Sequence, residues 1–240
     1  NMAGGKRSAR QKMINLMYLV FIAMVAMNMS KEVLSAFGFM NEKLETNNVS
    51  TTEKNNEAYA NLATKASEQA AKFGKLNQQA NEIKKYSNDF YSYLSDLKSK
   101  MTANIEDKTD YESMDKTEFL DVYFFKGDGY TTEGQEFLDK INNYKTNVNS
   151  TLGENNKFST TLEKRFSTNA ETNRDGKEIP WLKYRYEGFP LVASLTNLTQ
   201  MQADIKNTEA DIVSSLLGGK LEEALSLNNY KGIGALEKNA

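Results

Sequence analysis

Residues 73–101, FGKLNQQANEIKKYSNDFYSYLSDLKSKM, carry the pattern that decides the fold. One apolar row repeats every seven residues, and a second row lies beside it: Leu76, Ile83, Phe90 and Leu97, then Phe73, Ala80, Leu94 and Met101. Apolar residues at this spacing line one side of an α-helix, which other helices must cover. The stretch predicts one long helix over residues 51–103, opened by a capping box of Ser50 and Glu53.

The same spacing returns on both sides of this helix. Near the end of the chain, the row is Leu191, Leu198, Ile205 and Ile212, joined by Leu195 and Leu216. Gly218 and Gly219 are predicted to end that helix. Towards the start, apolar residues recur at every third or fourth position from Val33 to Leu44. They continue the helical pattern of residues 13–30 without a break, and the pattern stops at Asn47 and Asn48. These patterns predict an all-α protein built around an elongated, antiparallel helical bundle.

Shorter elements fill the region between the long helices. A helix is predicted from about residue 132 to Gly153, and another around residues 158–166. Gly127-Asp128-Gly129 indicates a turn. Residues 169–189 contain several aromatic side chains, and we expect them to form a loop or hairpin that caps the bundle.

Composition excludes several classes of function. The 240 residues contain no His and no Cys, which removes His-dependent triads, zinc sites built from these ligands and disulfides. The formal charge of −2 disfavours nucleic-acid binding. The sequence contains no glycine-rich phosphate loop and no metal-ligand cluster, so we expect no cofactor, no metal and no enzymatic activity.

Residues 13–30, MINLMYLVFIAMVAMNMS, contain no charged side chain. As a helix they would be about 27 Å long, close to the ~30 Å hydrocarbon core of a bilayer. A basic cluster precedes them: Lys6, Arg7, Arg10 and Lys12. The stretch therefore predicts a single transmembrane helix with a cytoplasmic N-terminus and the bulk of the chain outside, in the periplasm of a bacterium. A cleaved signal peptide is the alternative, but it usually has a shorter apolar region and a small-x-small cleavage site.

Three polar side chains stand in or beside this predicted span. Arg10 and Tyr18 lie on roughly one side of the helix, eight residues apart, and Asn15 is a candidate polar contact within the membrane. The span contains no Asp or Glu, so any proton-carrying carboxylate must come from a second membrane protein, with Arg10 as its counter-charge. Alternatively, Arg10 reaches the cytoplasmic headgroups and Tyr18 bonds within a helix pair.

The predicted organisation has four parts. They are a basic cytoplasmic segment at 1–12, the transmembrane helix at 13–30, a periplasmic bundle at 31–219 and the start of a linker at 220–240.

Two stretches carry a resemblance to a known family. MAGGKRSARQKMINLMYLVFIAMVAMNMSKEVLSAFGFMNEKL at 2–44 resembles the start of the GldM family, also called PorM, and EGFPLVASLTNLTQMQADIKNTEADIVSSLL at 187–217 resembles the last helix of its first periplasmic domain. These proteins are inner-membrane motor subunits of gliding motility and type IX secretion in Bacteroidetes. Members continue into further β-rich periplasmic domains, so the resemblance implies that this sequence stops short of the family's full length.

The resemblance also implies a mechanism. Two copies of the membrane helix would sit inside a ring of a multi-span partner, GldL or PorL, which supplies a membrane glutamate. Proton flow would move one part against the other, and the periplasmic dimer would carry the motion to secretion components at the outer membrane. Arg10 and Tyr18 match the family's membrane arginine and tyrosine. The alternative is a single-pass periplasmic sensor or adaptor whose helical bundle binds a ligand or a partner.

Overall fold

A computed structural model describes residues 9–27 and 29–238, with side chains for 9–20 and 29–218. The helices are α1 (Ala9–Met27), α2 (Lys31–Glu68), α3 (Ala70–Met101), the 3₁₀ helix η1 (Tyr111–Ser113), α4 (Glu118–Phe124), α5 (Thr132–Leu152), α6 (Ser159–Phe166), α7 (Trp181–Tyr186) and α8 (Leu191–Lys238). Two short antiparallel hairpins pair β1 (Phe125–Lys126) with β2 (Gly129–Tyr130) and β3 (Glu171–Thr172) with β4 (Glu178–Ile179). The mostly helical fold that the sequence predicts is confirmed.

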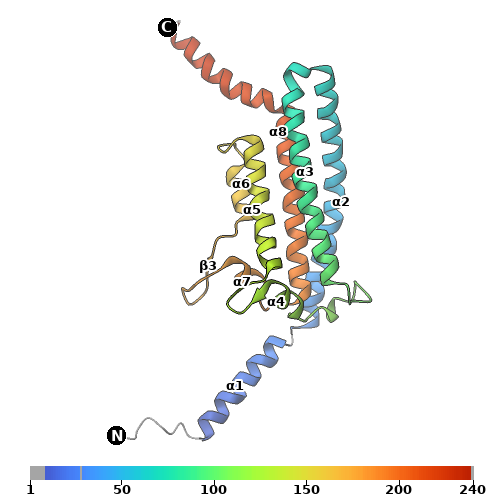
Figure 1. Cartoon of the computed structure of the whole chain (residues 1–240), viewed down its shortest axis with the longest axis vertical. Coiled ribbons are helices and arrows are strands. Elements are labelled where there is room, and N and C mark those ends of the chain that lie inside the picture. Colours follow the sequence, from blue (N-terminus) through green and yellow to red (C-terminus); the bar gives the residue numbers. More distant parts are fainter. Residues whose placement is uncertain (1–8, 28, 239–240) are drawn as a thin grey trace, which may run out of the picture.

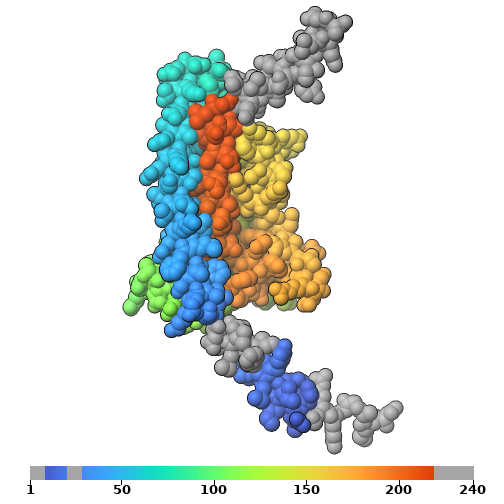
Figure 2. Space-filling view, turned by 180° about the vertical axis from the view of Figure 1, so that it is seen from behind, coloured from blue at the N-terminus to red at the C-terminus, as the bar shows by residue number. Residues whose placement is uncertain are grey.

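Three long helices form the body of the molecule (Figure 1). α2, α3 and α8 lie side by side, and α3 runs antiparallel to the other two. α5 packs against α3, and α6 contacts both α5 and α8. α1 extends from one end of this body, and α4 and α7 lie at that same end. α8 leads to the opposite end. The view from behind shows α2 and α8 in direct contact along the bundle (Figure 2).

The two apolar rows of α3 and the row of α8 build the core, as predicted. All eight α3 residues are at most 6% exposed, and Leu198, Ile205 and Ile212 of α8 are fully buried. A layer of aromatic rings closes the end of the bundle next to α4. Phe137 stacks on Phe124 at 4.9 Å and meets Tyr186 edge-on at 5.4 Å, with Trp181 at 6.2 Å. The prediction for the segment 169–189 is therefore confirmed in part: Trp181 and Tyr186 cap the bundle, and β3 and β4 form a hairpin. Residues 181–186 form the helix α7, which was not predicted, and Tyr184 and Phe189 are exposed.

The predicted boundaries of the first two long helices are wrong. The sequence predicted continuous helix across residues 29–30, but Ser30 caps α2 by accepting a hydrogen bond from the Val33 amide at 3.3 Å. The predicted break at Asn47 and Asn48 is absent from α2. The capping box predicted at Ser50 and Glu53 is also absent, because both residues lie inside α2. The neighbouring Thr51 and Thr52 hydroxyls donate to the carbonyls of Asn47 and Asn48 in the preceding turn, as threonines within a helix do.

Two further boundaries differ from the prediction. The helix predicted over 51–103 is divided at Gln69, whose φ of −133° and ψ of 65° turn α2 into α3. Gly218 and Gly219 do not end α8, which continues to Lys238. Glycine weakens a helix but ends one mainly through a left-handed conformation, and Gly218 is not among the glycines with positive φ. Gly153 has that conformation, with a φ of 97°, and ends α5 as predicted.

Two glycines inside long helices have opposite surroundings, which gives a matched pair of variants. A Cβ added to Gly38 of α2 would lie 2.1 Å from the ring of Tyr111, whereas one added to Gly74 of α3 meets nothing within 4 Å. We expect Gly74→Ala to stabilise the protein by about 1 kcal/mol through helix propensity. Gly38→Ala should destabilise it by about 1–3 kcal/mol, because the ring must move. Urea unfolding followed by circular dichroism measures both, and equal stabilisation would contradict the packing at Gly38.

Candidate functional site

The three residues predicted to act in the membrane all lie on α1. Arg10, Asn15 and Tyr18 are exposed, Tyr18 by 63%. The side-chain oxygen of Asn15 accepts a hydrogen bond from the side-chain amide of Gln11 at 3.3 Å. At about 100° per residue, Arg10 and Tyr18 are about 80° apart around the helix, so one partner surface can face both. The role of these three residues stays a prediction.

The predicted span 13–30 extends beyond α1 and includes residue 28, which lies outside the described residues, as do residues 1–8 of the basic segment. Within the parts of the chain that the structure describes, no helix is both long enough and apolar enough to cross a membrane.

The interface between α2 and α8 contains a row of buried polar side chains, which we call the polar seam. On α2, three asparagines occupy the heptad positions between the buried residues Leu34 and Leu62: Asn41, Asn48 and Asn55. On α8, the buried polar members of the seam are Thr196, Thr199, Gln202, Lys206 and Glu209. Buried polar groups cost free energy unless they are paired, so the partners of these residues determine what the seam does.

The seam fixes how α2 and α8 align. Asn48 Nδ2 donates to the carbonyl of Thr199 at 3.4 Å, and one heptad further Asn55 Nδ2 donates to the carbonyl of Lys206 at 3.0 Å. Both pairs are 151 positions apart, so the two helices run parallel and in constant register. Thr199 Oγ1 also donates to Asn41 Oδ1. Sliding either helix would leave these groups unpaired, as it does for a buried asparagine in a coiled coil.

A lysine of α3 joins all three long helices. Lys98 Nζ donates to Glu45 of α2 at 3.1 Å and to Thr199 and Gln202 of α8 at 2.9 and 2.8 Å. The lysine side chain is only 13% exposed. Gln202 in turn donates from Nε2 to Ser95 Oγ of α3 at 2.8 Å. Because the same groups connect α2, α3 and α8, the seam resists movement of any one of them alone.

A buried ion pair lies further along the seam. Lys206 Nζ is 3.3 Å from Glu209 Oε1, and the two side chains are 7% and 2% exposed. The Tyr59 hydroxyl of α2 donates to the other carboxylate oxygen, Oε2, at 2.6 Å. Oε1 makes no hydrogen bond within the described part of the chain, so its contact with Lys206 is ionic. Aromatic rings complete the cluster, with Lys206 over Tyr91 at 4.7 Å and Lys84 over Tyr59 at 5.3 Å.

Burial dominates the electrostatics of this cluster. It raises the pKa of the Glu209 carboxyl above its ordinary value, while Lys206 and the hydrogen bond from Tyr59 act in the opposite direction. Burial and the neighbouring Glu209 also raise the pKa of the Tyr59 hydroxyl, which therefore stays protonated and keeps donating to the carboxylate. The cluster consequently depends on its internal partners rather than on water.

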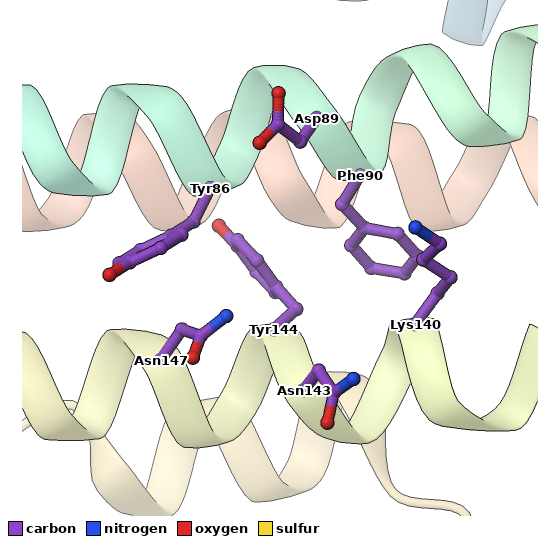
Figure 3. A pocket seen from close by; sticks show the side chains of 7 residues that line it. All are labelled: Tyr86, Asp89, Phe90, Lys140, Asn143, Tyr144 and Asn147. Atoms are coloured by element: carbon purple, nitrogen blue, oxygen red, sulfur yellow. The ribbon is translucent and has the colours of Figure 1, made fainter.

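Two of the hollows in the part of the chain that the structure describes have partly polar walls. The larger, about 590 Å³, lies between α2, α3 and the segment after α3, and its lining includes Glu42, Glu45, Lys98, Lys108 and Tyr111. The smaller, about 170 Å³, lies between α3 and α5 (Figure 3). Its residues are Tyr86, Asp89, Phe90, Lys140, Asn143, Tyr144 and Asn147. Within the described ranges, no three His, Cys, Asp or Glu side chains gather as they would around a metal ion.

The polar seam was missed from the sequence, although a signal for it exists. Asn41, Asn48 and Asn55 stand seven residues apart between Leu34 and Leu62. The interpretation of Asn47 and Asn48 as a helix end followed from the usual preference of asparagine for caps and turns. A heptad whose central positions are asparagine is typical of helices whose register is fixed by buried polar contacts.

Comparisons with known proteins give one result. A sequence profile of the GldM N-terminal domain matches residues 32–219, which include α2, the seam and α8 as far as Gly219. No curated protein matches the chain. The matched range begins after α1, so it leaves Arg10, Asn15 and Tyr18 untested.

Proposed function

The chain belongs to the GldM family, which is associated with gliding motility and type IX secretion, and from that premise we propose that it is part of a motor driven by the proton-motive force at the inner membrane. In this proposal α1 and the residues around it anchor the chain in the membrane, with a cytoplasmic N-terminus. The bundle stands in the periplasm and carries motion towards the outer membrane. The work is mechanical, and the protein is not an enzyme.

The observation that carries this proposal is the polar seam between two parallel helices. α2 follows α1 at one end of the bundle, and α8 leads away at the other end (Figure 1). A displacement or rotation that enters through α2 passes to α8 across contacts that tie the helices in one register, such as Asn55 to the carbonyl of Lys206. A purely apolar interface tolerates sliding better than one that must keep each polar group paired.

The membrane part of the proposal rests on the sequence. Residues 13–30 contain no carboxylate, so the group that binds and releases protons must belong to another protein. We propose a multi-span partner similar to GldL that supplies a membrane glutamate and surrounds two copies of this chain. Arg10 and Tyr18 would face that glutamate, because a guanidinium stabilises a charged carboxylate and a phenol hydrogen-bonds to it. Asn15 would bond within the same assembly.

Copurification tests this proposal. We expect the full-length protein, purified from its own bacterium in mild detergent, to retain a multi-span partner with a glutamate in one of its spans. A control with Leu16→Glu and Leu19→Glu, which disrupts the apolar surface of α1, should lose that partner while circular dichroism still shows the folded bundle. A protein that purifies without the partner, but with a small periplasmic ligand in the hollow beside Lys98, would contradict the motor and favour the sensor or adaptor.

A further inference from the structure

The exposed apolar side chains of the bundle lie in its half nearer α1, and Val49, near the middle of α2, is the farthest of them along that helix. Beyond α1, the large apolar residues that the structure shows as exposed are Val33, Phe39, Met40, Val49, Phe119, Val122, Tyr184 and Phe189. They belong to the first half of α2, to α4 and to the segment 184–189, which precedes α8. Where side chains are described, α3, α5, α6 and α8 contribute none. This distribution singles out the end of the bundle from which α1 leaves (Figure 1).

Three of these residues form what we call the α4 patch: Phe119, Val122 and Phe189. Val122 is 75% exposed, Phe189 43% and Phe119 36%. The Gly188 amide donates to Asp121 of α4 at 2.9 Å, which places the backbone of the residue before Phe189 beside the helix. The patch therefore joins two segments that are distant in the sequence.

The α4 patch is the outer side of a helix whose inner side is already buried. Leu120 and Phe124 are 3% and 0% exposed, and Phe124 belongs to the aromatic layer that closes the bundle. The sequence of α4, EFLDVYF, leaves only Glu118 and Asp121 as charged residues, and Asp121 is bonded to Gly188. A helix that is apolar on both sides needs an apolar neighbour on each side, and here the outer neighbour lies outside the bundle.

A bilayer surface fits the position and chemistry of this patch. α1 leaves from the same end of the bundle, and its described side chains from Met13 to Val20 are exposed and apolar apart from Asn15 and the Tyr18 hydroxyl. Aromatic and aliphatic side chains favour the boundary between headgroups and acyl chains. Charge does not provide this attraction, because acids outnumber bases in residues 104–130 and Glu118 lies exposed beside Phe119. The apolar side chains carry the contact.

We propose that the α4 patch inserts into the headgroup region of the phospholipid bilayer that holds α1. This proposal rests on the membrane anchor in the proposed function. It adds a second contact between the bundle and the bilayer surface, besides the anchor at α1. Met29 and Ser30 separate α1 from α2 as non-helical residues, so the tether alone does not fix how the bundle stands on the membrane. Contact at the patch restrains that orientation, because it places a second point of the bundle on the surface.

Site-directed spin labelling tests the proposal, because the 240 residues contain no Cys. The full chain carries one nitroxide in each of three variants, Val122→Cys, Glu68→Cys and Leu16→Cys, in nanodiscs of phosphatidylethanolamine and phosphatidylglycerol. Collisions with oxygen and with a water-soluble nickel chelate report lipid and water respectively. Glu68 is the matched control, since it is exposed and ends α2 at the far end of the bundle.

We expect the ratio of oxygen to nickel collisions to be several-fold higher at residue 122 than at residue 68. Equal ratios at these positions, with residue 16 in lipid, would overturn the α4 patch proposal and leave the anchor intact. A label at residue 16 that reports water would instead overturn the anchor in the proposed function. Shielding of residue 122 from both reagents would show a protein on the patch, and it would also overturn the lipid proposal.

Discussion

Glu209→Leu is expected to destabilise the protein by about 3–5 kcal/mol, because it leaves the ammonium of Lys206 buried without its carboxylate. Both side chains are buried, so water cannot replace the lost partner. The variant also removes the acceptor of the Tyr59 hydroxyl. Urea unfolding followed by circular dichroism at 222 nm measures the change.

The double variant Lys206→Met with Glu209→Leu separates the effect of removing the whole ion pair from the effect of leaving one charge unpaired. We expect it to recover most of the loss, because apolar side chains of similar size replace both buried charges and leave neither unpaired. The matched control is the exposed pair Lys85 and Asp89, whose side chains are 72% and 66% exposed and whose removal should change stability by less than about 1 kcal/mol. Additive losses in the double variant would show that the two buried charges do not depend on each other.

Arg10→Ala is expected to abolish gliding and type IX secretion while the protein still assembles with its membrane partner. The reason is electrostatic: in the motor we propose, loss of the guanidinium would remove the counter-charge of the partner's glutamate, whose protonation would then no longer change the contact with α1. Motility on agar and the amount of secreted cargo measure function, and copurification measures assembly.

The control for Arg10 is Lys12→Ala. It removes the same charge from the same helix, but two residues further on, or about 200° around α1. We expect Lys12→Ala to keep most of the function and Arg10→Lys to keep part of it. If Arg10→Ala bacteria glide and secrete normally, Arg10 has no part in the mechanism. If the Lys12 and Arg10 variants fail equally, only the total positive charge before the span matters.

The polar seam has a cost that a mechanical role explains. Apolar residues in place of Asn41, Asn48 and Asn55 would continue the heptad of α2 and pack without any need for partners. Buried polar contacts add little net stability, but misalignment leaves them unpaired and is therefore penalised. In the motor we propose, such an interface keeps α2 and α8 in one register while force passes between them.

Much of the fold was predictable from local patterns. The rows of α3 and α8 are buried as expected, and Gly153 ends α5. The errors concern places where local preference and packing disagree. Asn48 favours a turn in isolation, yet it lies inside α2, where its side-chain amide donates a hydrogen bond to the carbonyl of Thr199. Gly218 weakens a helix without ending one, since its backbone keeps a negative φ.

By itself, the sequence determined the helical class, the apolar rows, aromatic residues that cap the bundle and an uncharged stretch that contains no carboxylate. Those features depend on spacing and composition, which act locally along the chain. Only the tertiary structure decided that α2 runs parallel to α8, that three asparagines face its polar groups, and that Glu209 lies buried between Lys206 and Tyr59. These features join residues about 150 positions apart, and a periodic pattern shows which side of a helix is covered but not which helix covers it.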